Sequence, residues 1–157
     1  LDNKAVFNDI FYEKQIAYYS QIKEFNKKIG NLKNLISTFP SKNYAYIKYL
    51  YEFINSGKKI NINLFYSKLS KKQKNDYRIL VLISYYFYIN KNYLNSKKFI
   101  NKSCKNNFFD LMPLKLKYLI LIKLNKIKEA TKFVKEVELN KNINLNKINL
   151  KIKYYDF

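Results

Sequence analysis

Residues 85–94 read YYFYINKNYL, an aromatic run that ends in a short polar turn before the chain becomes apolar again. The same organisation occurs once before, as YEFINSGKKI at 51–60, and once after, as LILIKLNKIK at 119–128. The turn residues Gly57, Lys91 and Asn125 are evenly spaced, and so are the large apolar residues four positions before them, Phe53, Phe87 and Leu121. This recurrence has a 34-residue period and predicts an array of similar helix pairs joined by short polar turns.

A second apolar stripe follows the turns. After the third turn, Ala130, Val134 and Val137 share one helical face at i, i+4 and i+7. At the position of Ala130 in the preceding copies stand Ser96 and Ile62. Ser96, and Ser84 on the helix before it, stand where small side chains let the two helices of a pair approach closely.

The spacings define four frames and a capping segment: 9–42, 43–76, 77–110, 111–144 and 145–157. The first frame matches weakly, because Lys28 stands at its small position and Gly30 falls inside its second helix. One long leading helix, from Asp2 or Asn3 to Ile29, is therefore the alternative for that region.

This pattern resembles the tetratricopeptide repeat, a family of helix pairs with the same period. The closest match is KLNKIKEA at 123–130, and Pro40 lies where the family tends to place a proline between repeats. The family's tryptophan is absent from every frame. The resemblance implies an all-α solenoid of three to four antiparallel helix pairs, formed as one domain over residues 1–157.

Composition also favours helices and removes most enzyme chemistry. The 157 residues include only two Gly and two Pro, whereas turn-rich β folds need more of both. There is no His and a single Cys, Cys104, which excludes His-based catalysis and an internal disulfide. The acidic residues suit helices: Asp76 and Asp110 as N-caps, and Glu129 as the i,i+3 partner of Lys132. We therefore expect no catalytic residue, no cofactor and no metal.

The chain is strongly basic, with 31 Lys and Arg against 11 Asp and Glu and a formal net charge of +20. The positive charge is spread evenly over the frames, and Lys, Asn, Ile, Tyr and Phe dominate the composition. We interpret the lysines as a solvated surface shaped by an A/T-rich genome. A face for binding nucleic acid or anionic lipid is the alternative.

The resemblance further implies a concave groove lined by the first helix of each pair. Carrying the family's register over assigns the following residues to it: Tyr44, Ile47, Tyr51, Ile54 and Asn55; Arg78, Val81, Tyr85, Tyr88 and Ile89; and Met112, Lys115, Leu119, Ile122 and Lys123. Tyr51, Tyr85 and Tyr88 would be anchors for a partner. Arg78, Lys115 and Lys123 would attract its acidic groups. A groove filled by the chain's own leading helix, or by a second copy, is the alternative.

The sequence thus predicts a non-catalytic scaffold or adaptor that binds a peptide or helix of another protein. An RNA- or DNA-binding helical repeat and a homo-oligomerisation module are the alternatives.

The longest apolar run, Ile79 to Ile89, is too short for a membrane span, so no transmembrane segment is expected here. Because the chain begins at Leu1, we expect a piece of a larger, bacterial protein. Its soluble domain would be cytoplasmic or tethered to the cell envelope by an upstream segment.

Overall fold

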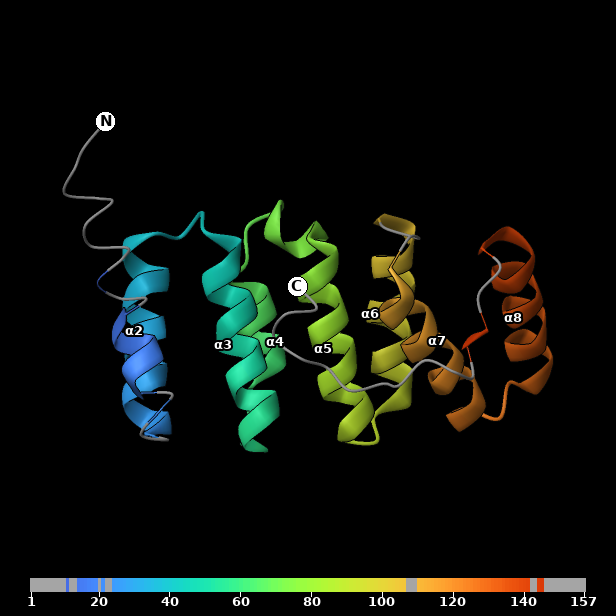
Figure 1. The fold of residues 1–157 in the computed structure, drawn as a ribbon, viewed down its shortest axis with the longest axis horizontal. Helices are drawn as coiled ribbons and strands as arrows, with labels where there is room; N and C mark the ends of the chain where they lie inside the picture. Colours follow the sequence, from blue (N-terminus) through green and yellow to red (C-terminus); the bar gives the residue numbers. More distant parts are fainter. Residues whose placement is uncertain are drawn as a thin grey trace. The chain divides into compact units, whose positions relative to one another are not determined.

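The computed structural model describes residues 11, 14–19, 21, 24–106, 110–141 and 144–145 (Figure 1). These residues form helices, turns and short connections, and no strand occurs among them. The expectation of an all-α chain is confirmed for this part. The elements are α2 (Phe25–Thr38), α3 (Asn43–Ser56), α4 (Ile62–Ser67), η1 (Gln73–Asn75), α5 (Tyr77–Ile89), α6 (Tyr93–Asn106), α7 (Leu111–Lys123) and α8 (Ile127–Lys141).

The chain divides into two compact units, Leu1–Asn61 and Ile62–Phe157. In the first unit α2 packs against α3. One cluster of its core consists of Ile16, Ile29, Leu32, Leu35 and Ala45. Phe25 and Phe53 meet edge to face above this core, with 5.3 Å between their ring centroids.

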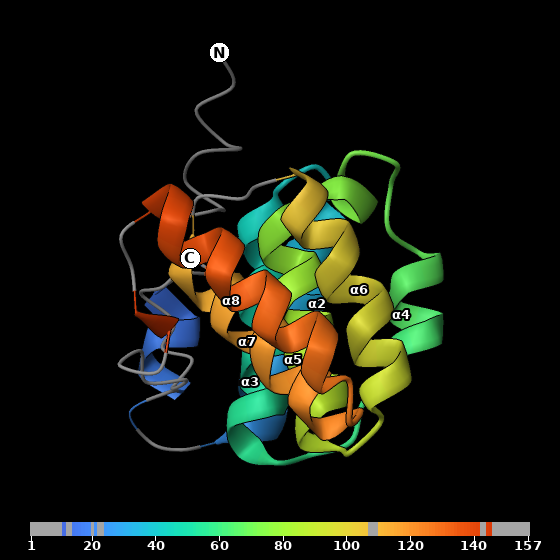
Figure 2. The same cartoon turned by 90° about the vertical axis from the view of Figure 1, so that its right-hand side faces the viewer.

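In the second unit each helix from α5 onward packs against the next one in the chain. Figure 1 shows α6, α7 and α8 in this order, and Figure 2 views them with α8 nearest the viewer. Two core clusters hold them together. One joins Val81, Ile100, Cys104, Leu116 and Ile120 from α5, α6 and α7. The other joins Leu114, Leu121, Ala130, Phe133, Val137 and Leu145.

The helices repeat the spacing of the sequence. Helices α3, α5 and α7 begin at Asn43, Tyr77 and Leu111, which are the first residues of three of the frames. Helices α6 and α8 begin at Tyr93 and Ile127, again one period apart. The turn residues Gly57, Lys91 and Asn125 all have left-handed backbone, with φ of 67°, 60° and 56°. The same left-handed backbone conformation therefore recurs at the ends of three helices, one period apart.

Helices α5 and α6 form an antiparallel pair. The Ser103 hydroxyl donates to the Tyr77 carbonyl, and the Ser84 hydroxyl donates to the Ser96 carbonyl, so positions ascend on one helix as they descend on the other. Asp76 starts α5, because its carboxylate accepts a hydrogen bond from the Arg78 backbone N–H at 3.0 Å. Its predicted N-cap role is confirmed. Asp110 occupies the same position before α7, without a side-chain cap bond.

The frame 43–76 departs from this pattern in its second half. Helix α4 has only six residues and begins five positions after Gly57, whereas α6 begins two positions after Lys91. The polar run from Ser67 to Lys72 has too few apolar side chains to continue an apolar stripe. Instead, the Gln73 side chain accepts from the Ser70 N–H and closes the turn that leads into η1.

The alternative of one leading helix to Ile29 is wrong, because Glu24 is non-helical, with φ −82° and ψ 81°, and α2 begins only after it. Gly30 lies inside α2, as the sequence predicted. The Lys28 ammonium at the predicted small position is 2.6 Å from the Glu52 carboxylate of α3. Of the predicted capping segment 145–157, only Leu145 lies among the described residues.

Candidate functional site

The predicted groove residues are divided between the two units. Tyr44, Ile47, Tyr51, Ile54 and Asn55 lie on α3 in the first unit. The others lie on α5 and α7, which contact each other in the second unit. The candidate site is therefore built from the α5–α7 face, the part of the prediction that one compact unit brings together.

On α5, Tyr85 and Tyr88 form a stacked pair with 6.4 Å between ring centroids and 17° between ring planes. Both side chains are half-buried and pack against the cluster of Val81 and Ile120. Burial raises the pKa of both phenols above the ordinary tyrosine value. Tyr88 also meets the ring of Tyr93 at 5.7 Å. The pair thus presents rigid, partly exposed aromatic surface on a packed base.

On α7, Met112 is half-buried against the same cluster. Leu119 is also half-buried, and Ile122 and Lys123 are exposed towards the end of the helix. Apart from Lys123, these α7 side chains are apolar, and Met112 packs on the same cluster as the tyrosine pair. We refer to Tyr85, Tyr88, Met112, Leu119, Ile122 and Lys123 as the α5–α7 face.

Two residues predicted to line the groove belong to the core instead. Val81 has no exposed surface, because it packs between α6 and α7 against Ile100 and Leu116. Ile47 is buried in the first unit. Both sit on the inner side of their helix, since one turn of register decides which side chain of an apolar helix faces the neighbouring helices.

The predicted cationic residues Arg78 and Lys115 are engaged within the chain. Lys115 is buried, its ammonium donates to the Leu145 carbonyl at 2.7 Å, and it lies 5.4 Å from the Tyr118 ring. Arg78 binds Asp76 through two nitrogens, at 3.1 Å and 2.8 Å. Hydrogen bonding to Asp76 raises the pKa of the Arg78 guanidinium. Of the three predicted cations only Lys123 is exposed.

The α3 residues are placed as follows. Tyr44 packs against the core of the first unit, and the Lys42 ammonium lies 5.8 Å from its ring centroid. Tyr51 and Ile54 are half-buried, and Asn55 is exposed. Ile89, at the end of α5, is exposed.

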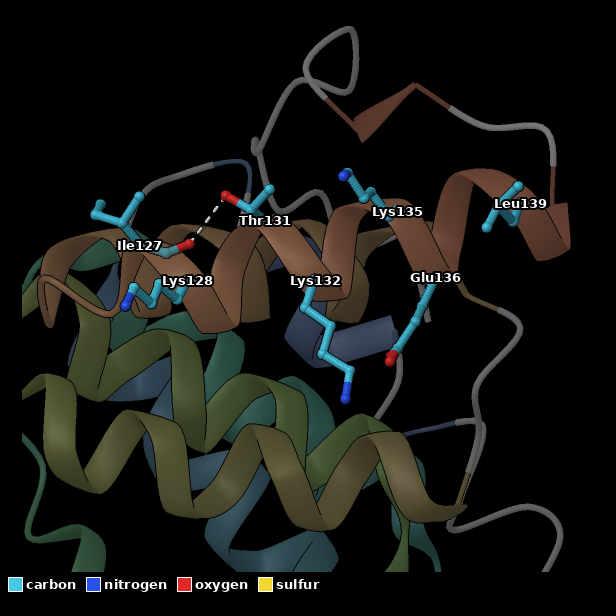
Figure 3. Close-up of a pocket in the computed structure, with 7 residues that line it drawn as sticks. All are labelled: Ile127, Lys128, Thr131, Lys132, Lys135, Glu136 and Leu139. Atoms are coloured by element: carbon cyan, nitrogen blue, oxygen red, sulfur yellow. Dashed lines mark hydrogen bonds between the residues drawn. The ribbon is translucent and has the colours of Figure 1, made fainter.

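Sequence reasoning missed a second surface, on the outer side of α8. Seven side chains line a shallow groove there: Ile127, Lys128, Thr131, Lys132, Lys135, Glu136 and Leu139 (Figure 3). The signal was present in the sequence as positions 127, 131, 135 and 139, spaced by four. This pattern is weak because only its two end positions, Ile127 and Leu139, carry apolar side chains.

No group of His, Cys, Asp and Glu suited to a metal ion occurs in the described ranges. Cys104 is buried in the cluster with Val81 and Ile120. Burial raises the pKa of its thiol, and the charge of Lys117 lowers it by a smaller amount.

Glu129 pairs with Lys126 and Lys97 rather than with the predicted Lys132. These two ammonium groups lower the pKa of the Glu129 carboxyl to about 2.

Comparison with protein-family models, curated proteins and solved structures finds no match to this chain. Within the part of the chain that the structure describes, no helix is long and apolar enough to cross a membrane.

Proposed function

We propose that this chain is a tetratricopeptide-like helical-repeat solenoid that acts as a non-catalytic protein-interaction module, a scaffold or adaptor. The architecture is supported by helix starts at Asn43, Tyr77 and Leu111 and by left-handed turns that recur with the same period. A repeat of this kind builds a continuous core by stacking similar helix pairs, and it leaves one face of the first helices for a partner.

The stacked pair of Tyr85 and Tyr88 carries the functional proposal. Aromatic side chains that are half-buried on a packed base lose little conformational freedom on binding, and they are enriched among the residues that dominate binding energy. A peptide or helix of a partner would lay apolar side chains on these rings and on Met112 and Leu119. Lys123 at the edge would attract an acidic group of the partner.

The test is a pull-down with the whole chain at moderately high salt, with and without nuclease, followed by binding measurements with the captured protein. We expect Tyr85→Ala with Tyr88→Ala to weaken its binding by about a hundredfold, as loss of two hot-spot residues does. The matched control is Leu64→Ala with Leu94→Ala, which removes two exposed side chains of the same unit that lie on α4 and α6.

Circular dichroism must show the same helix content and melting temperature for the wild-type chain and both variants. If the tyrosine variant is less stable, Tyr85→Phe with Tyr88→Phe should keep the binding and Ile122→Asp should lose it. Unchanged binding by the tyrosine and Ile122 variants would overturn the proposal. So would recovery of nucleic acid alone, lost on nuclease treatment, because that outcome assigns the function to the lysines.

A further inference from the structure

Helix α8 has one buried and one open side. Its inner side places Ala130, Phe133 and Val137 in the core with residues of α7. Its outer side is the shallow groove of Figure 3, with a volume of about 530 Å³. The seven lining residues follow the helix from Ile127 at one end to Leu139 at the other. We call this surface the outer α8 face.

The ends of the outer α8 face are apolar and exposed. Ile127 is 51% exposed and Leu139 is 86% exposed. They stand twelve positions apart in the sequence, which places them about 18 Å apart along the helix axis. Between them the Thr131 hydroxyl donates to the Ile127 carbonyl at 3.0 Å, so that its hydrogen bond is made within the helix. The same twelve positions turn the two side chains about 120° apart around α8, so about three turns of a partner helix can reach both only by crossing α8 obliquely, along its i, i+4 row.

The middle of the outer α8 face is positively charged. Lys128, Lys132 and Lys135 are exposed and make no ion pair with the residues that the structure describes. Glu136 is the one acidic residue that lines the groove. The positive charge is therefore not balanced within the face, unlike that of Lys126, which pairs with Glu129.

Helix α6, the second helix of the preceding pair, makes one contact of the kind that such a face could make. Thr131 corresponds to Lys97 of α6 in the repeat spacing. The Lys97 ammonium reaches forward to the Glu129 carboxylate of α8 at 2.9 Å. A lysine on this side of one helix thus binds an acidic residue on a later helix. On α8 the same side carries three lysines around Thr131.

From this arrangement we propose that the outer α8 face docks an acidic amphipathic helix of a partner protein. Two aliphatic side chains of that helix, about three turns apart, contact Ile127 and Leu139, and the carboxylates between them pair with Lys128, Lys132 and Lys135. A second copy of this chain fits less well, because its net charge of +20 brings like charge to the lysines. A nucleic acid finds no aromatic ring among the seven lining residues on which bases could stack.

The probe is a fluorescein-labelled helical peptide with two leucines twelve residues apart and glutamates between them. Its binding to the whole chain is followed by fluorescence anisotropy near physiological salt. The charge variant is Lys128→Glu with Lys132→Glu and Lys135→Glu. The matched control is Lys68→Glu with Lys71→Glu and Lys72→Glu, which changes the net charge equally at three exposed lysines between α4 and η1. We expect at least about a tenfold loss of affinity for the first variant and less than about a twofold loss for the control.

Two further comparisons separate docking from general attraction between opposite charges. Ile127→Ser with Leu139→Ser should weaken the peptide's binding by about tenfold, and a peptide of the same composition with scrambled order should bind correspondingly weakly. Equal losses in the two charge variants, or equal binding of the ordered and scrambled peptides, would overturn the proposal. A charge variant that lost helix content would be replaced by Lys128→Gln with Lys132→Gln and Lys135→Gln, with the same expectation. Concentration-dependent sedimentation that these substitutions abolish would assign the face to self-association and also overturn it.

Discussion

The side chains of Ser84 and Ser96 exchange hydrogen bonds across the α5–α6 pair. The Ser84 hydroxyl donates to the Ser96 carbonyl at 2.9 Å, and the Ser96 hydroxyl donates to the Ser84 carbonyl at 2.8 Å. Both residues are fully buried. This reciprocal contact holds the two helices close enough to leave no space for a larger side chain.

Replacing Ser96 by leucine should therefore destabilise the second unit. Because the site is fully buried, overpacking should lower the free energy of unfolding by about 2–3 kcal/mol. Ser96→Ala keeps the volume and loses only the hydroxyl bonds, so its cost should be about 1 kcal/mol. Urea unfolding followed by circular dichroism measures both values. A leucine variant as stable as the wild-type chain would show that α5 and α6 are not closely packed at this point.

Lys91 and Asn125 hold left-handed backbone at turns where glycine would fit without strain. Lys91→Gly should raise the free energy of unfolding by about 0.5–1 kcal/mol, because the relief of the left-handed conformation outweighs the added freedom of the unfolded chain. Asn125→Gly should gain less, since asparagine tolerates this conformation better than lysine. Gly57→Ala, at φ 67°, should lose about 1 kcal/mol. Thermal melts of the three variants test this order, and a destabilised Lys91→Gly variant would contradict it.

The ion pair between Lys28 and Glu52 joins α2 to α3, and its side chains are only 12% and 11% exposed. Lys28→Met leaves the Glu52 carboxylate without this partner, so the first unit should lose about 2 kcal/mol of stability. Replacing both partners with apolar residues, as Lys28→Met with Glu52→Leu, should cost less than the single change. A double-mutant cycle by denaturant unfolding gives the coupling energy, and strictly additive costs would rule the interaction out.

The pKa of the Glu129 carboxyl should be about 2, well below the ordinary glutamate value of 4.5. The cause is hydrogen bonding to Lys126 and Lys97 in the folded chain. Because the folded pKa is lower than the unfolded one, the pairing stabilises the fold fully above about pH 4.5 and is lost as the pH falls towards 2. NMR titration of the glutamate carboxyl carbons measures this directly. The shift should disappear in Lys97→Met with Lys126→Met, and an ordinary titration of Glu129 in the wild-type chain would contradict the geometry.

The Cys104 thiol is buried, and its pKa is raised by burial. At neutral pH it should react with a thiol reagent at least about tenfold more slowly than free cysteine, since the thiolate is the reactive form. In urea the rate should rise to that of an unfolded chain. With a thiol reagent that releases a coloured product, absorbance measures the reaction rate in buffer and in urea. Fast reaction of the folded protein would mean that the cluster of α5, α6 and α7 opens readily.

Local chemistry explains why much of the helical frame was predictable. The start of α5 depends on Asp76, whose carboxylate bonds to a backbone N–H only two residues away. The turn at Lys91 depends on its own backbone conformation and on the polar residues beside it. Such short-range interactions depend only on a few consecutive residues. The 34-residue period of the sequence therefore recurs as the spacing of the helix starts.

What the sequence alone determined is therefore the class of secondary structure, the turns and the period. Tertiary structure decided which side chains remain available to a partner. Val81 and Tyr85 stand one turn apart on α5, yet α6 and α7 cover the first and leave the second half exposed. Lys115 appeared suited to a partner's acidic group, but its ammonium binds the carbonyl of Leu145, 30 residues further along the chain. Burial and charge pairing of this kind arise between residues that are distant in sequence, and no local pattern encodes them.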